Sequence, residues 1–155
     1  MPAMQVVVPT VQAADVSMVT GAKRADVDRS AVEEYGVTIL QMMEQAGSHL
    51  DDVVRLEVGG NLQGRRIVVA VGPGNNGGGG LAAARHLANR GATVRVVLAR
   101  PALRMTEAAQ HQLATLLAME IDCCVATYDL SDDELEHVLA SADIVVAAVP
   151  GYRTH

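Results

Sequence analysis

From residue 66 onward, short apolar runs rich in β-branched residues alternate with helical stretches. Runs this short and this continuously apolar are typical of strands buried on both faces of a parallel sheet. Parallel neighbours need a crossover between them, and the intervening helical stretches supply it with the usual right-handed sense. The alternation therefore predicts a doubly wound α/β fold with a mostly parallel sheet. The expected strands are 67–71, 92–99, 123–128 and 142–149, and the expected helices are 81–90, 106–119 and 131–141.

Length and charge narrow the classes of protein further. A chain of 155 residues suits one domain, and the absence of Phe and Trp leaves a core of Val, Leu, Ile, Ala and Met. The net charge of -6 and the pI near 5.2 argue against nucleic-acid binding. No apolar run approaches the roughly 18 to 20 residues that span a bilayer, and the N-terminus lacks the pattern of a secretory signal. We therefore expect a single cytoplasmic domain over residues 1–155, with no membrane or nucleic-acid partner.

The segment before the first strand predicts an arm followed by two helices. Residues 1–15 show no helical period and are expected to form the arm, and the helix pair is expected over 16–60. Asp26 or Asp28 is a candidate cap for the first helix, which Gly36 can end. Thr38 is a plausible N-cap for the second, whose apolar residues recur at three- and four-residue spacing as far as Val58. The βαβ core then occupies 66–155.

The connection after the first strand is unusually rich in glycine. The stretch from Val68 to Leu81 reads VVAVGPGNNGGGGL, and six of the nine residues from Gly72 to Gly80 are Gly. Its first part matches G-x-G-x-x-G directly after a strand, where backbone N–H groups and a helix N-terminus can hold an anionic, nucleotide-like ligand. The alternative is a tight turn with no ligand. The acidic residue that would bind the ribose of NAD is missing at the end of the second strand, and Arg100 stands there instead. An arginine at this place is typical of NADP binding, so a third and weaker hypothesis is an NADP-dependent oxidoreductase.

Two motifs in sequence order resemble one known family. GPGNNGGGGLAAARHLANRG is similar to the G-x-G-N-N-G-G-D-G-x-x-A-A-R-x-L signature of the YjeF N-terminal domain family, the NAD(P)H-hydrate epimerases. The upstream DRSAVEEYGVTILQMMEQAG resembles that family's amino-terminal helix pair. The resemblance covers Val16 to Tyr152, and it implies a Rossmann-like three-layer α/β/α sandwich, often dimeric.

The resemblance also implies a function and a site. Members of the family epimerise hydrated NADH and NADPH, so that a partner NAD(P)HX dehydratase can restore the nucleotide. The implied substrate-binding residues are Asn75, Asn76, Gly77, Gly78 and Gly79, with a second loop beginning at Gly151. A potassium ion is the implied cofactor, and Asn76 is its implied ligand.

Two positions depart from the family pattern. Gly79 stands where the signature has Asp, and Ala147 stands where the fourth strand of the family carries Asp. Two carboxylates are thereby missing, which weakens a cation site and removes the obvious general acid or base, so no catalytic residue is assigned. The alternative function is accordingly a catalytically impaired relative that acts as a nucleotide-binding or protein-interaction module.

The remaining reactive side chains have simpler interpretations. Cys123 and Cys124 are expected to be two buried thiols in a strand, since a disulfide between neighbours is strained. His86 is expected to pack against a neighbouring element, and the other histidines have no clustered partners for a metal. Arg104 follows the second strand and either reaches a substrate phosphate or faces solvent.

Overall fold

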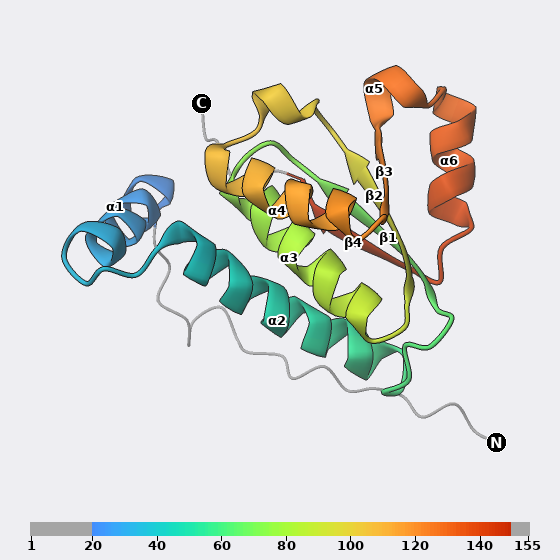
Figure 1. Ribbon diagram of the computed structural model, residues 1–155, viewed down its shortest axis with the longest axis horizontal. Helices are drawn as coiled ribbons and strands as arrows, with labels where there is room; N and C mark the ends of the chain where they lie inside the picture. The colour runs from blue at the N-terminus through green and yellow to red at the C-terminus, as the bar shows by residue number, and fades with distance from the viewer. Residues whose placement is uncertain (1–19, 150–155) are drawn as a thin grey trace.

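The computed structural model describes residues 20–149, and in them a four-stranded parallel sheet is flanked by helices (Figure 1). The strand order is β3-β2-β1-β4, and all three neighbouring pairs run parallel. The predicted mostly parallel α/β fold is thus confirmed. The strands are β1 (Arg66–Val71), β2 (Thr93–Leu98), β3 (Asp122–Val125) and β4 (Ile144–Ala148), and the helices are α1 (Gly21–Glu33), α2 (Ile39–Glu57), α3 (Asn75–Asn89), η2 (Ala102–Arg104), α4 (Glu107–Ala118), α5 (Ala126–Asp129) and α6 (Asp132–Ala140).

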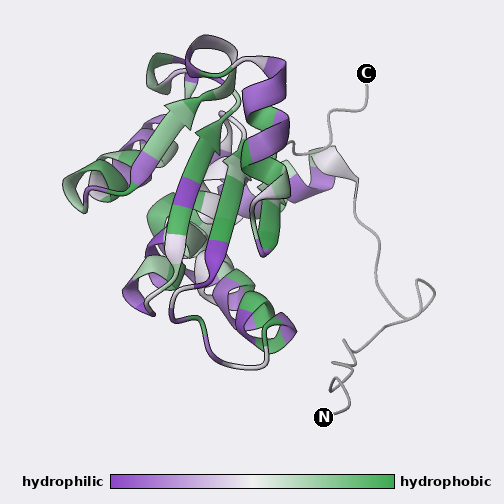
Figure 2. Ribbon diagram, turned by 90° about the vertical axis from the view of Figure 1, so that its right-hand side faces the viewer, coloured by the Kyte–Doolittle hydropathy of each residue, from purple (hydrophilic) through white to green (hydrophobic). Residues whose placement is uncertain are grey.

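The two faces of the sheet bury different layers. Because side chains alternate along a strand, Val69 and Val96 face one side and pack with Leu81 of α3 and Leu113 of α4. On the other side, Val68, Val97 and Cys124 pack against Val138 of α6. Figure 1 shows α3 and α4 on one side of the sheet and α6 on the other, and Figure 2 shows how apolar the strands between them are. These layers confirm the predicted α/β/α sandwich.

The first two helices differ in how they pack on the rest of the domain. Thr38 caps α2 in a reciprocal capping box with Gln41, as expected for its position, and α2 packs along α3. By contrast α1 buries no residue and lies at one end of α2 (Figure 1). Its N-cap is Thr20, whose side chain accepts a hydrogen bond from the N–H of Lys23, so the prediction of an Asp26 or Asp28 cap was wrong. No helix within 20–149 is long and apolar enough to cross a membrane.

Two further element boundaries differ from expectation. The third strand ends at Val125 rather than at Tyr128, because the carboxylate of Asp129 accepts a hydrogen bond from the N–H of Val125 at 2.6 Å and the short helix α5 begins there. More important for the site, α3 begins at Asn75 and not at Leu81. The glycine-rich stretch is therefore mostly helix, and only residues 72–74 form the connection from β1.

Candidate functional site

The connection after β1 lies where the strand order of the sheet reverses. β2 and β3 extend to one side of β1 and β4 lies on the other, and open α/β sheets bind ligands at the carboxyl ends of strands at such a point. Gly72 lies at this point in close contact with the end of β4, and its N–H donates a hydrogen bond to the carbonyl of Ala148 at 3.0 Å. A Cβ atom at position 72 would lie 2.0 Å from the carbonyl oxygen of Val149, so no other residue fits here without movement of the backbone.

The first turn of α3 presents unpaired backbone donors beside this connection. Gly74 is its N-cap and provides no side-chain cap. The first N–H groups of a helix have no partner within it and carry the positive end of the helix dipole, which favours an anion. Thr106, the N-cap of α4, holds the connection in place: its N–H donates to the carbonyl of Pro73 at 2.9 Å and its hydroxyl donates to Oδ1 of Asn75 at 3.0 Å.

The glycines within α3 serve packing more than ligand access. A Cβ atom at Gly77 would lie 1.9 Å from the carbonyl oxygen of Gly72, and one at Gly80 would lie 2.6 Å from Cβ of Ala148. At Gly78 it would lie 2.3 Å from Cε of Met43. The sequence predicts that this run of glycines forms a loop that binds a ligand. The structure corrects that interpretation, because all three are buried where α3 approaches its own N-terminal connection, α2 and β4.

Gly79 is different from its three neighbours. A Cβ atom at this position would meet only Cβ of Ala46, at 3.5 Å, which is an ordinary van der Waals contact. The backbone of Gly79 also lines a pocket between α1, α2 and the start of α3. A side chain at position 79 would therefore fit and extend toward this pocket.

The pocket has an apolar floor and a polar rim. It encloses about 130 Å³, which is less than the ~300–1,000 Å³ of pockets that bury a whole drug-sized ligand. As it stands, it has room for only part of a ligand of that size. The floor is formed by Ile39, Met42, Met43 and Ala46 of α2, and the rim by Asn75, Asn76, Gly79, Arg24 and Asp28.

Arg24 and Asp28 are the charged residues of the pocket, and the sequence did not predict them as site residues. They lie four residues apart on α1, a spacing that places two side chains on the same face of a helix. That spacing was a usable signal, but nothing in the sequence indicated that this face of α1 turns toward α3. Both lie on α1, a helix for which the family resemblance implied no role in the site.

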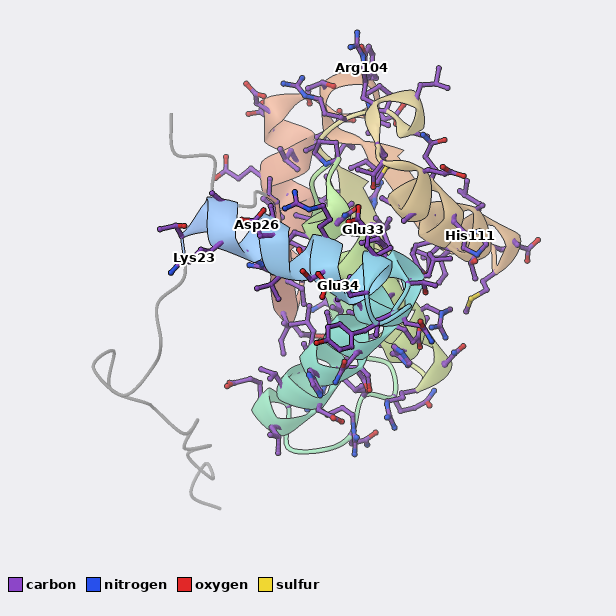
Figure 3. All side chains as sticks on the ribbon, turned by 90° about the vertical axis from the view of Figure 1, so that its left-hand side faces the viewer. Lys23, Asp26, Glu33, Glu34, Arg104 and His111 are labelled. Carbon is purple, nitrogen blue, oxygen red and sulfur yellow. The ribbon has the colours of Figure 1, made fainter. Side chains whose placement is uncertain are left out.

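Other predicted site residues do not reach this pocket. Ala147 of β4 pairs with Ala70 and is exposed on the face of the sheet opposite to α3, so it does not line the pocket with Gly79. Arg104 is exposed in η2, and Figure 3 shows it well away from α1. Arg100 is also exposed. Gly151 lies outside the described residues.

A charged cluster on α2 and α3 lies outside the pocket. The carboxylate of Glu44 pairs with the Arg85 guanidinium and lies 2.7 Å from Nε2 of His86. The hydrogen bond from Arg85 holds the pKa of Glu44 below its ordinary value, with further lowering from the charge of the same guanidinium. The expectation that His86 packs against a neighbouring element is thus confirmed. Residues 20–149 contain no group of three or more His, Cys, Asp or Glu side chains that could hold a metal ion.

The parallel sheet, its reversed strand order and the glycine-rich entry into α3 define a Rossmann-like α/β domain. A crystal structure of a yeast protein, ynu0, has the same fold, with a TM-score of 0.75 and 24% identity over 90% of this chain and 60% of that one.

Comparison of the sequence then gives the family. The model of the YjeF-related protein N-terminus matches residues 39–155, and the chain belongs to this family. A NAD(P)H-hydrate epimerase of Dehalogenimonas lykanthroporepellens is 34% identical over 92% of this chain and 55% of its own length. A bifunctional NAD(P)H-hydrate repair enzyme of Salinibacter ruber is 39% identical over 88% of this chain and 24% of its own length. The chain thus spans about half of that epimerase and less of the bifunctional enzyme.

Proposed function

We propose that this chain acts as a NAD(P)H-hydrate epimerase, interconverting the R and S epimers of hydrated NADH and NADPH. The observation that carries the proposal is the family match over residues 39–155, which includes the start of α3 and most of the pocket beside it. Relatives named as epimerases share 34–35% identity with this chain over 83–92% of its length.

The geometry at the start of α3 supports binding of such a substrate. A dinucleotide carries a pyrophosphate, and the uncapped first turn of α3 offers N–H donors to an anion. The neighbouring pocket is lined by Asn75 and Asn76, whose amides both donate and accept hydrogen bonds, above an apolar floor that can contact a ring. We therefore propose that residues 75–79 bind NADHX or NADPHX, with Gly151 as a further contact.

A coupled assay tests this function directly. The chain is incubated with the R epimer of NADHX and a dehydratase specific for the S epimer, and the recovery of NADH is followed by absorbance. We expect recovery faster than spontaneous epimerisation allows, in proportion to the amount of chain added. A rate equal to that of the dehydratase alone would reject the epimerase function.

A second function is favoured by the missing carboxylates at Gly79 and Ala147. A domain that keeps the fold and the donors of α3 but lacks a general acid or base would bind nucleotides without converting them. Saturable binding of NADPH, measured by calorimetry, together with no acceleration in the coupled assay, would support this binding module over the epimerase.

Several finer features belong to the same proposal. The side-chain oxygen of Asn76 is the ligand that we assign to potassium. Gly79 contributes no oxygen from a side chain and Ala147 does not line the pocket, so the donor set is poor and we assign no step of the reaction to the ion. Replacing KCl by NaCl in the coupled assay tests whether potassium is needed, and we expect only a small change in the rate of epimerisation.

A homodimer, an NAD(P)HX dehydratase as functional partner and a cytoplasmic location complete the proposal. Light scattering of the purified chain tests the dimer.

A further inference from the structure

Asp28 is the one carboxylate among the described residues that line the pocket at the start of α3. It is half-buried, on a helix that buries no residue, and it lies one turn after Arg24. Its neighbour Asp26 pairs with Arg29 at 2.6 Å, whereas Asp28 forms no ion pair within residues 20–149. The carboxylate of Asp28 is therefore available to a ligand in the pocket.

Across the pocket from α1, α3 has room for a side chain but carries none. Gly79 lines the pocket, and a Cβ atom there would touch only Ala46. Close packing requires the glycines at 77 and 80, and a Cβ atom at 78 would displace the flexible end of Met43, but no contact requires a glycine at 79. The pocket thus combines a vacant position on α3 with a carboxylate supplied from α1.

We propose that Asp28 supplies the acidic group of this pocket and binds the substrate, accepting a hydrogen bond from a hydroxyl or amide donor of the hydrated nicotinamide ring. This inference rests on the proposed function. A carboxylate only accepts hydrogen bonds, while the Arg24 guanidinium one turn away only donates them. A hydrated nicotinamide nucleotide offers both kinds of partner, since its ring hydroxyl and carboxamide donate and its phosphates accept.

The variant Asp28→Asn tests this role, because the amide keeps the size of the side chain but removes its charge. A hydrogen bond to a charged group contributes enough that its loss weakens binding about 10-fold or more. We therefore expect KM for R-NADHX to rise by about that factor, with a smaller change in kcat. Asp26→Asn is the matched control, since Asp26 lies on the same helix, is exposed and does not line this pocket. It is expected to keep the KM of the unmodified chain.

Moving the carboxylate from one helix to the other gives a second, independent test. The double variant Asp28→Asn with Gly79→Asp places an acidic side chain at the vacant position on α3. We expect it to recover at least about a third of the affinity lost in Asp28→Asn, whereas Asp28→Asn with Gly79→Ala recovers none. A purely structural role for Asp28 would not be rescued by a carboxylate on α3. Thermal unfolding of each variant checks that it is folded.

The outcomes separate this inference from the proposed function. An active chain in which Asp28→Asn and Asp26→Asn have the same KM would overturn the role of Asp28 and leave the epimerase function standing. A chain that does not epimerise, but whose NADPH affinity falls about 10-fold in Asp28→Asn alone, would reject the epimerase and support the role of Asp28 in binding. A chain that neither epimerises NADHX nor binds NADPH would overturn both.

Discussion

Gly47 of α2 lies against Ala82 of α3 with no space for a side chain between the two helices. A Cβ atom at position 47 would lie 2.7 Å from Cβ of Ala82 and 2.7 Å from the backbone nitrogen of Ala83. Because the second neighbour is backbone, the clash cannot be relieved by a change of rotamer. This contact sets how closely α2 approaches α3, and thereby where the floor of the pocket lies relative to residues 75–79.

Substituting Gly47 should therefore destabilise the fold. We expect Gly47→Ala to lower the free energy of unfolding by about 1–3 kcal/mol, as overpacking does, despite the higher helix propensity of alanine. Gly79→Ala is the matched control, since that helical glycine has room for Cβ, and it should be stabilising by about 0.5–1 kcal/mol. Urea denaturation followed by circular dichroism measures both. Equal effects of the two substitutions would contradict the packing described here.

The ion pair between Asp51 and Arg90 makes a second prediction. Asp51 is 1% exposed, and Nε of Arg90 in the loop after α3 donates to its Oδ2 at 2.7 Å. Removing the partner leaves a buried carboxylate unpaired, so we expect Arg90→Ala to lower the free energy of unfolding by about 1–3 kcal/mol.

The exposed pair of Arg55 with Asp52 on α2 provides the control for that measurement. Exposed pairs contribute little, so Arg55→Ala should cost about 0–1 kcal/mol. The double variant Arg90→Ala with Asp51→Asn should be at least as stable as Arg90→Ala alone, because the neutral amide removes the unpaired charge. A further loss of stability in the double variant would show that the buried charge is not the cause.

The Glu44 cluster predicts a dependence of stability on pH. The hydrogen bond from Arg85 lowers the pKa of Glu44 below its ordinary value of 4.5 in the folded chain. A carboxyl whose pKa is lowered on folding stabilises the fold above its ordinary pKa, and this contribution is lost as pH falls through the lowered value. We therefore expect Glu44→Gln to lower Tm at pH 7, and expect the difference from the unmodified chain to shrink below pH 4.5.

Scanning calorimetry between pH 3 and 7 follows this difference. Glu57→Gln, at the exposed end of α2, is a suitable control and should leave Tm close to that of the unmodified chain throughout. A difference for Glu44→Gln that grows on acidification would reverse the expected sign and contradict the prediction.

Cys123 should be slow to alkylate in the folded chain. Burial raises its pKa from 9.0 to about 11, with smaller contributions from the charges of Asp122 and Cys124. Since the thiolate is the nucleophile, we expect iodoacetamide to modify Cys123 at pH 8 at least about 10-fold more slowly in the native chain than in guanidinium chloride. Mass spectrometry of the alkylated peptide, in a Cys124→Ser variant, measures this rate. Equal rates in the two conditions would contradict the partial burial of this thiol. Of the two thiols expected to be buried, only Cys124 is, while Cys123 is half-buried.

The sequence indicated the cap of α2 because an N-cap depends on a residue beside the first turn, and Thr38 caps α2 as expected. The capping box that Thr38 forms with Gln41 was not predicted. It misplaced the start of α3 because glycine normally weakens a helix. Here α3 continues through four glycines, since only glycine allows position 77 to lie against Gly72 and position 80 against Ala148. Those partners are set by the packing of α3 on the sheet, which local patterns do not contain.

By itself, therefore, the sequence determined the parallel α/β architecture and the family, because hydrophobic periodicity and a contiguous motif are local properties of the chain. Only the tertiary structure decided what the glycines do and which side chains share the pocket. Arg24 and Asp28 lie some fifty residues before Asn76 and Gly79, yet they line one pocket with them, since α1 leads into α2 and α2 packs on α3. It is this long-range contact that places a carboxylate opposite Gly79.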